Sequence, residues 1–212
     1  MRTKIALAMR LGILPGLVLI AALTVFAPRV QAESSGATIV TRDFQAGLVE
    51  VMKEAEKLSV KQRFDRLAPL VDKTFHLPLM TQISTSNYWT KATPDERQSL
   101  IRAFRRMSIA TLATLFDGYS GETFQVNAEK SGPSKTTLVL TKLIKSDNST
   151  VDIAYVAREF RSAGWRLIDV IVDSGISELK VRRSEYALVL KKNGVAGLIS
   201  LLNGKADELI SG

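Results

Sequence analysis

The most informative stretch of this chain is residues 88–119, which opens with Tyr-Trp-Thr-Lys-Ala-Thr-Pro-Asp-Glu-Arg and closes with Leu-Phe-Asp-Gly-Tyr. It contains a helix start, because Thr93 can cap free amides, Pro94 needs no N–H at the first helical position and Glu96 completes a capping box. We therefore predict a helix over about 94–117. Its apolar side chains recur at helical spacing: Leu100, Ile101, Phe104, Met107, Leu112, Leu115 and Phe116. A stripe this wide is typical of an ordinary core helix or of a helix that also faces an apolar ligand, and the pattern leaves both open.

The first 32 residues have the pattern of a secretory signal peptide. Basic residues precede an apolar run over 11–26, and Val-Gln-Ala at 30–32 places small residues at the −3 and −1 positions of a cleavage site. We predict cleavage after Ala32, which leaves 33–212 as a single domain. The run is shorter than the roughly 20 residues of a membrane span, so we favour cleavage over the alternative of an uncleaved anchor.

Composition narrows the class of protein. The chain has no cysteine and one histidine, which argues against disulfides and the usual zinc and copper clusters and suits an exported bacterial protein. Its formal net charge is +8, and four basic residues lie in the predicted signal peptide, so residues 33–212 carry +4. The charges are dispersed, and we expect no nucleic-acid partner. A mildly basic surface suits transient contact with an anionic membrane, although solvated side chains explain it equally well.

The order of the expected elements predicts an α+β fold rather than alternating βαβ units. Besides the long helix, helices are expected at about 38–57, from 60 with a kink or restart at Pro69, at 184–192, where Ser184 would cap the start, and from 195 onward. Ser59 and Gln62 form a capping box at the start of the second of these helices. Four extended segments are expected at about 122–129, 136–145, 150–160 and 165–173. Short turn signals between these segments favour an antiparallel meander. We therefore expect a small twisted antiparallel sheet of about four strands, packed with N- and C-terminal helices.

The sequence shows no catalytic constellation. His76 has no Gly-x-Ser-x-Gly elbow to support a triad, so we expect it to satisfy a local backbone group. Asp169 lies among apolar residues of an expected strand, where it would need a partner such as an arginine, and we expect a structural role. A phosphate-binding Gly-rich loop is also missing. We therefore predict a protein that is not an enzyme and needs neither metal nor cofactor.

Short motifs along residues 38–205 carry a family resemblance. They are Asp72, Phe75 and Met80; Trp89, Ala92-Thr93-Pro94 and Arg97; Phe104, Asp117-Gly118-Tyr119 and Phe124; Trp165, Asp169 and Gly175-Ile176-Ser177; and Ser184-Glu185-Tyr186, Asn193-Gly194 and Leu198. In this order and spacing, the chain resembles the periplasmic lipid-binding proteins of the toluene-tolerance, or MlaC-like, family.

Further motifs are similar to the hopanoid-associated (HpnM-type) branch of that family. They are Phe-His-Leu-Pro-Leu-Met at 75–80, Ala-Phe-Arg-Arg at 103–106, Phe-Asp-Gly-Tyr-Ser-Gly-Glu at 116–122 and Val181-x-Arg183-Ser184-Glu185. His76 stands where the branch pattern has an acid, so a role for that acid does not transfer to this chain.

The resemblance implies a cone similar to nuclear-transport-factor folds, with an apolar pocket between sheet and helices that receives lipid tails. It implies a monomeric periplasmic carrier that moves a hopanoid or phospholipid between inner and outer membrane, as the soluble component of a lipid transport system. Its partners would be an inner-membrane transporter and an outer-membrane acceptor. Exposing the tails to water costs about 0.8 kcal/mol per CH₂, or on the order of 20 kcal/mol for a whole lipid, so such a carrier needs an apolar pocket rather than a reactive group.

We expect three segments to line that pocket. The segment before the long helix supplies Phe75, Met80, Ile83 and Trp89; the long helix supplies Phe104, Leu112, Leu115 and Phe116; and the sheet supplies Leu138, Leu140, Tyr155, Val170 and Val172. Each of these residues could instead belong to a plain core.

Two alternatives stay open. The first is a module that binds a protein partner of an envelope complex through an exposed apolar groove. The second is an enzyme on the same fold that acts on an apolar substrate, which would need at least two convergent titratable groups.

Overall fold

The structure is a computed structural model and describes residues 35–173 and 175–211. The predicted signal peptide, 1–32, lies outside these residues, so its cleavage and the 33–212 domain stay predictions. Across the described part of the chain, no helix combines the length and hydropathy that a membrane span requires.

The predicted α+β fold is confirmed, with helices before and after one sheet. The helices are α1 (Gly36–Glu54), α2 (Val60–Thr74), α3 (Leu77–Thr85), α4 (Asn87–Lys91), α5 (Pro94–Leu115) and α6 (Glu178–Ser211), with short 3₁₀ turns at Ala55–Lys57 and Pro133–Lys135. The strands are β1 (Thr123–Gly132), β2 (Thr136–Ile144), β3 (Thr150–Phe160), β4 (Gly164–Val172) and β5 (Ile176–Ser177). Strand order follows chain order and every pair is antiparallel, so the predicted meander is present with a short fifth strand added.

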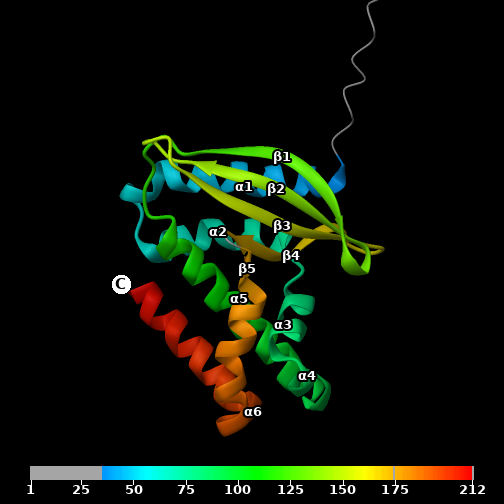
Figure 1. Ribbon diagram of the computed structural model, residues 1–212. Helices are drawn as coiled ribbons and strands as arrows, with labels where there is room; N and C mark the ends of the chain where they lie inside the picture. The colour runs from blue at the N-terminus through cyan, green and yellow to red at the C-terminus, as the bar shows by residue number, and fades with distance from the viewer. Residues whose placement is uncertain (1–34, 174, 212) are drawn as a thin grey trace, which may run out of the picture. The chain divides into compact units, whose positions relative to one another are not determined.

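The sheet bends over α1, which contacts β1 to β4 on the inner face (Figure 1). Register shifts between Val126 and Ala128 in β1, and beside Val156 and Ala157 in β3, mark the irregularities that let an antiparallel sheet curve. Gly36 starts α1 directly against the indole of Trp165, where a Cβ would lie 2.1 Å from Cδ1. The small residue therefore lets the start of α1 approach the sheet closely.

Both predicted capping boxes are present. The Thr93 N–H donates to Glu96 Oε2 at 2.8 Å, and the Glu96 N–H donates to Thr93 Oγ1 at 3.2 Å. Ser59 and Gln62 repeat the arrangement at the start of α2, with distances of 2.9 and 3.2 Å. Side chains thus satisfy amides that each helix start would otherwise leave without partners.

Two local expectations are corrected. The expected restart at Pro69 is wrong, because α2 continues through this residue, with Leu67 and Val71 buried on either side of it. The last helix begins at Glu178 rather than near Ser184, because Ser177 Oγ accepts the Lys180 N–H and caps an earlier start. The predicted break at Asn193-Gly194 is present, since Gly194 has φ +65° inside α6, a value glycine adopts without strain.

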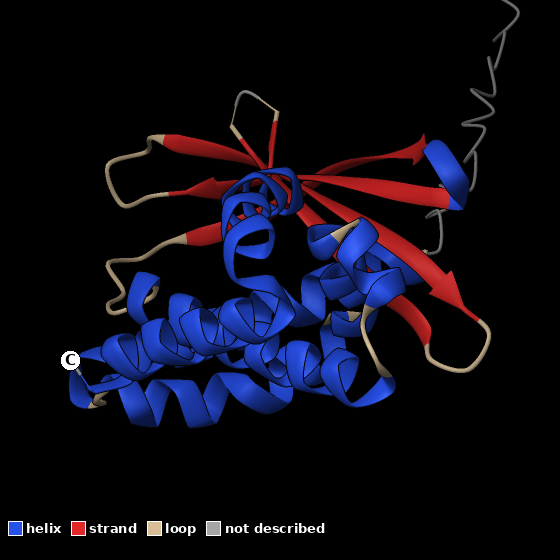
Figure 2. Ribbon diagram, turned by 90° about the horizontal axis from the view of Figure 1, so that it is seen from below, coloured by secondary structure: helices blue, strands red, loops and turns tan. Residues whose placement is uncertain are grey.

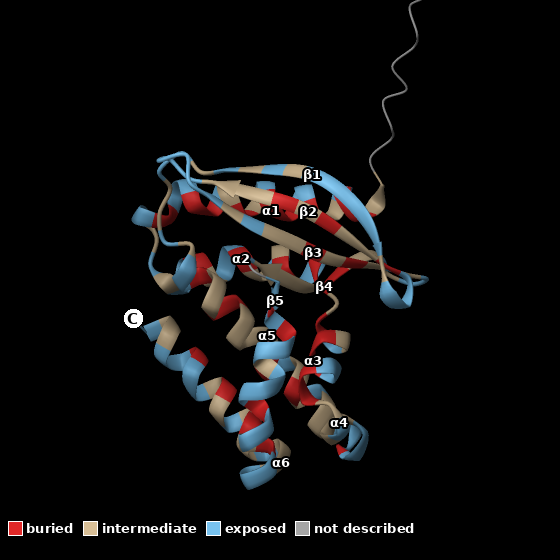
Figure 3. Ribbon diagram, viewed as in Figure 1, coloured by how far each residue is buried: buried red, intermediate tan, exposed pale blue. Residues whose placement is uncertain are grey.

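The helices form a layer beneath the sheet (Figure 2). Both α3 and α5 contact α6, and α2 contacts α5, so α5 is enclosed by its neighbours. Buried residues lie on the faces that helices turn toward one another and toward the sheet, while β1 is largely exposed (Figure 3). Packing is therefore dense within the helical layer, and the site lies where this layer meets the sheet.

Candidate functional site

An apolar cavity of about 220 Å³ lies between the inner face of the sheet and the helices. Helices α1 to α3 and the residue that follows α2 contribute Phe44, Leu48, Val71, Phe75, Leu77 and Met80; α5 and its end contribute Ser108, Thr111, Leu112, Leu115 and Phe116; the sheet contributes Phe124, Ile153, Tyr155, Val170 and Val172; and α6 contributes Glu178, Leu179 and Arg182. Glu178 and Arg182 are the two charged residues of this lining.

Strand alternation explains which residues of the sheet line the cavity. Tyr155 pairs with Val170 and Ile153 pairs with Val172, so all four side chains project from the same face of β3 and β4. The neighbouring β2 continues this face with Val139 and Thr141, which are both buried. This face is therefore a continuous apolar surface with two hydroxyls, those of Thr141 and Tyr155; Thr141 donates to the Ile153 carbonyl at 2.9 Å.

Three aromatic rings pack at the centre of the lining. Phe44 makes edge contacts with Phe75, with ring centroids 5.0 Å apart, and with Tyr155 at 6.1 Å. Burial raises the pKa of Tyr155 to about 12, and its hydroxyl bonds to the Gln45 side chain. The phenol is therefore neutral at ordinary pH, and this part of the cavity offers no reactive group.

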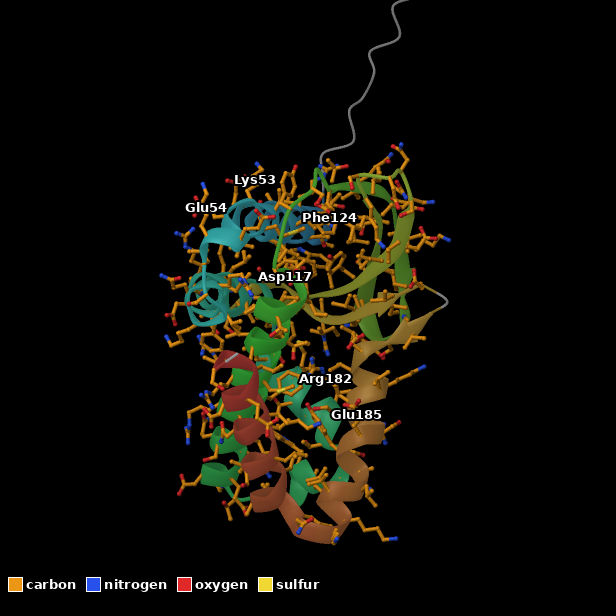
Figure 4. The ribbon with its side chains drawn as sticks, turned by 90° about the vertical axis from the view of Figure 1, so that its left-hand side faces the viewer. Lys53, Glu54, Asp117, Phe124, Arg182 and Glu185 are labelled. Atoms are coloured by element: carbon orange, nitrogen blue, oxygen red, sulfur yellow. The ribbon has the colours of Figure 1, made fainter. Side chains whose placement is uncertain are left out.

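The cavity opens beside the end of α5. Leu115 is 67% exposed although it lines the cavity, which places it at the mouth. Figure 4 labels two further lining residues, Phe124 on the sheet and Arg182 on α6 below it. The lining thus runs from a buried aromatic centre to an edge that meets solvent.

Eight of the thirteen predicted lining residues surround this cavity: Phe75, Met80, Leu112, Leu115, Phe116, Tyr155, Val170 and Val172. That they contact lipid stays a prediction. The other five, Ile83, Trp89, Phe104, Leu138 and Leu140, lie outside the lining.

The directions of Leu138 and Leu140 correct an expectation. These residues pair with Val156 and Ala154, on the face of the sheet opposite the cavity. The inward positions of β2 belong to Val139 and Thr141, because neighbours along a strand point to opposite faces. Leu138 and Leu140 were expected on the cavity face of the sheet, yet the strand register places them on the opposite face.

The other three residues lie away from the cavity for different reasons. Phe104 is 1% exposed and packed into the core of the helical layer. Ile83 is partly exposed on α3, and Trp89 lies on α4, where the Arg97 guanidinium stands over its ring. Trp89 borders a separate hollow together with Pro94 and Arg97.

Sequence reasoning missed eleven residues of the lining: Phe44, Leu48, Val71, Leu77, Ser108, Thr111, Phe124, Ile153, Glu178, Leu179 and Arg182. Strand alternation could have found Ile153, which is two residues from Tyr155. Helical spacing could have added Ser108 and Thr111, which lie one turn before Leu112 and Leu115. The sequence gives no sign that α6 brings Glu178 and Arg182 to the same cavity.

The two polar residues singled out from the sequence have structural roles. His76 Nδ1 accepts the Leu79 N–H at 3.1 Å and caps α3, as predicted for a local backbone group. Asp169 accepts the Val170 N–H at 2.8 Å, the Ser177 hydroxyl at 2.5 Å and the Leu179 N–H at 3.1 Å. Its partners are thus the start of α6 rather than an arginine, and the carboxylate joins β4 to that helix.

The residues of 35–173 and 175–211 contain no group of His, Cys, Asp and Glu side chains that could hold a metal ion. Fold and cavity together define a class: an α+β protein in which helices and a curved antiparallel sheet enclose an apolar cavity with few polar groups.

The chain belongs to the MlaC protein family, whose model matches residues 42–204. It is also similar to a solved structure, that of a phospholipid-binding protein from Ralstonia solanacearum in complex with a phospholipid. The two share 18% sequence identity and a TM-score of 0.73, and the match covers 82% of this chain and 99% of the other. At this low sequence identity, the match shows that the two proteins share a fold.

Proposed function

We propose that this protein is a periplasmic phospholipid-binding protein that carries lipid through water and is not an enzyme. The observation that carries the proposal is the apolar cavity between sheet and helices, in a chain of the MlaC family. The Ralstonia solanacearum protein with the same fold is described with a bound phospholipid, which supports the same ligand class here.

The chemistry of the lining supports a carrier. Its side chains are mostly aliphatic and aromatic, and the phenol of Tyr155 is held neutral by burial. An enclosed apolar surface offsets the cost of exposing lipid tails to water, at about 0.8 kcal/mol per CH₂. We therefore propose that lipid tails enter the cavity and that the lining excludes water from them.

The cavity must widen to hold a whole lipid. Pockets for drug-sized ligands are about 300–1,000 Å³, whereas this cavity is about 220 Å³. We expect bound tails to separate α5 and its end from the sheet, because Leu112 and Phe116 line one side and Ile153 the other.

The remaining details form part of the proposal. We propose export by the predicted signal peptide, transfer between an inner-membrane transporter and an outer-membrane acceptor, transient contact with the membrane surface, and action as a monomer. A hopanoid is the alternative ligand, supported by the motif resemblance at 75–80.

The test is native mass spectrometry with lipid extraction on protein expressed as the full chain and purified without detergent. We expect one phospholipid per protein, or its uptake after incubation with phospholipid vesicles. A protein that stays empty under both conditions would contradict the proposal and favour the partner-binding module. A bound hopanoid would support the role as a lipid carrier but would show that the ligand is a hopanoid rather than a phospholipid.

A matched pair of variants assigns binding to the cavity. Ile153→Asn places an amide on the cavity face of β3, whereas Leu140→Asn places the same group on the outer face of β2. We expect at least a tenfold loss of loading for Ile153→Asn, because a polar group without a partner is costly in an apolar site. Leu140→Asn should load like the wild type, and both are compared at matched melting temperature. Equal loading by the two variants would show that the tails bind elsewhere.

A further inference from the structure

One part of the cavity is chemically different from the rest. Arg182 of α6 and Ser108 of α5 both line it, and they bring hydrogen-bond donors to a mostly apolar wall. The Arg182 guanidinium stands over the Phe104 ring, 5.4 Å from its centroid. Phe104 and Ser108 are four residues apart on α5, so they lie on the same face of the helix with their backbones roughly 6 Å apart along its axis. The two donors therefore approach the same part of the cavity from two helices.

Neither donor has a partner suited to its chemistry. Arg182 is partly buried, and its hydrogen bond is to the neutral Tyr186 hydroxyl at 3.3 Å; within the described residues it forms no ion pair with a carboxylate. Ser108 Oγ is buried without a hydrogen-bond partner in the same part of the chain. A partly buried cation without a carboxylate beside it and a buried hydroxyl without a hydrogen bond are both unfavourable, which indicates that a ligand supplies the acceptor.

We propose that Arg182 and Ser108 bind the phosphate of a glycerophospholipid, and so select phosphate esters over neutral lipids. This inference rests on the proposed function and deepens it. A phosphodiester fits both donors, because its oxygens accept the forked N–H groups of arginine and the hydroxyl at the same time. A hydrocarbon polycycle without an anionic group would leave both donors unsatisfied.

Glu178 limits which phospholipid fits. It lies four residues before Arg182 and also lines the cavity, and no ion pair within 35–173 and 175–211 joins the two. A carboxylate disfavours a second net negative charge nearby, so it favours a head group that carries an amine beside the phosphate. Phosphatidylethanolamine is therefore the probe used in the test.

The experiment compares two lipids that differ in the head group. Protein from the full chain is incubated with vesicles of dioleoyl phosphatidylethanolamine that contain dioleoylglycerol, and the lipids bound to the re-isolated protein are quantified by mass spectrometry. The preference for phosphate is the ratio of phospholipid to dioleoylglycerol bound to the protein, divided by the same ratio in the vesicles. We expect the wild type to prefer the phospholipid at least tenfold, and Arg182→Gln to lower that preference about tenfold.

Matched variants separate recognition from folding. Arg183→Gln is the control, because Arg183 is the next residue of α6, is exposed and donates to Ser86 Oγ at 3.0 Å outside the cavity. It should keep the wild-type preference. Ser108→Ala should lower the preference severalfold without lowering the melting temperature, because the hydroxyl has no protein partner to lose.

The outcomes are distinct. A wild type that binds both lipids equally, or an Arg182→Gln variant that keeps the full preference, would overturn the phosphate site and leave the carrier intact. A wild type that takes up neither lipid would overturn the proposed function itself. Reduced preference in both Arg182→Gln and Ser108→Ala, with Arg183→Gln unchanged, supports the inference.

Discussion

The two halves of α5 carry the same kind of apolar stripe but have different surroundings. In the first half, Leu100 and Phe104 are almost fully buried in the helical layer. In the second half, Leu112 lines the cavity and Leu115 is 67% exposed at its mouth. The difference arises from the neighbours, because Leu100 and Phe104 pack in the helical layer, whereas Leu112 and Leu115 border the cavity; the other face of the second half, with Ile109 and Ala113, is also fully buried. Apolar periodicity therefore predicts which face of a helix turns inward, but not whether it meets protein or empty space.

The largest expected effect comes from removing the residue that holds the second half of α5 in place. Arg63 of α2 is 7% exposed, and its guanidinium donates to the carbonyls of Ala113, Ala55 and Leu58 at 2.7, 3.0 and 2.6 Å. We expect Arg63→Met to lower the free energy of unfolding by about 4 kcal/mol, since buried carbonyls lose a charged donor. Urea denaturation measures the change.

A control for this variant lies on the same helix. Arg66 pairs with Glu54 at the exposed surface, and we expect Arg66→Met to cost less than about 1 kcal/mol. Equal losses for both variants would show that Arg63 does not anchor the wall of the cavity.

The next prediction compares substitutions in the two halves of α5. We expect Leu100→Ala to cost about 3 kcal/mol, because it leaves a void in a packed core. Leu112→Ala should cost about 1 kcal/mol, because its side chain already borders a cavity. Equilibrium unfolding in urea, with m-values compared, tests the difference. If the Leu112 variant loses as much as the Leu100 variant, the second half of α5 is core rather than wall.

A third variant enlarges the side chain at position 112 instead of shortening it. Leu112→Trp should lower lipid loading at least tenfold by occupying the cavity, while the free energy of unfolding changes by no more than about 1 kcal/mol. Lipid extraction and thermal unfolding of the same sample measure both quantities. Leu188→Trp is the control, because Leu188 is 72% exposed on α6 and outside the lining. Undiminished loading in Leu112→Trp would place the lipid elsewhere.

The smallest effect concerns pH at the start of α3. Burial, with repulsion from Arg166 and Arg158, lowers the pKa of His76 from its ordinary 6.5, and Nδ1 accepts the Leu79 N–H only when unprotonated. The unfolded chain therefore binds this proton more readily than the folded protein. Its contribution to stability is complete above about pH 6.5 and is lost as pH falls through the lowered pKa.

His76→Asn tests this dependence, because asparagine can cap a helix without titrating. We expect the variant to flatten the decline in stability below pH 6.5 by no more than about 1 kcal/mol, the usual contribution of a helix cap. Thermal unfolding between pH 4 and 8 measures it. A decline identical to that of the wild type would assign the pH dependence to other groups.

Local rules predicted much of the fold. The two capping boxes, the four long strands and the break at Gly194 all follow from neighbouring residues, whose interactions do not depend on distant parts of the chain. The continuation of α2 through Pro69 did not follow, because packing of its buried face outweighs the lost hydrogen bond. The fifth strand was also missed, since its two residues are ordered by pairing with β4.

The sequence by itself determined the family resemblance, the α+β class and the order of the four long strands and the helices around them, because periodicity and capping act over a few residues. Only the tertiary structure decided which apolar residues form a wall and which form core. Strand register turned Leu140 outward and Ile153 inward, and helix packing brought Arg182 over Phe104, one turn from Ser108. The physical reason is that a cavity is a gap left between elements distant in the chain, so no local pattern encodes it.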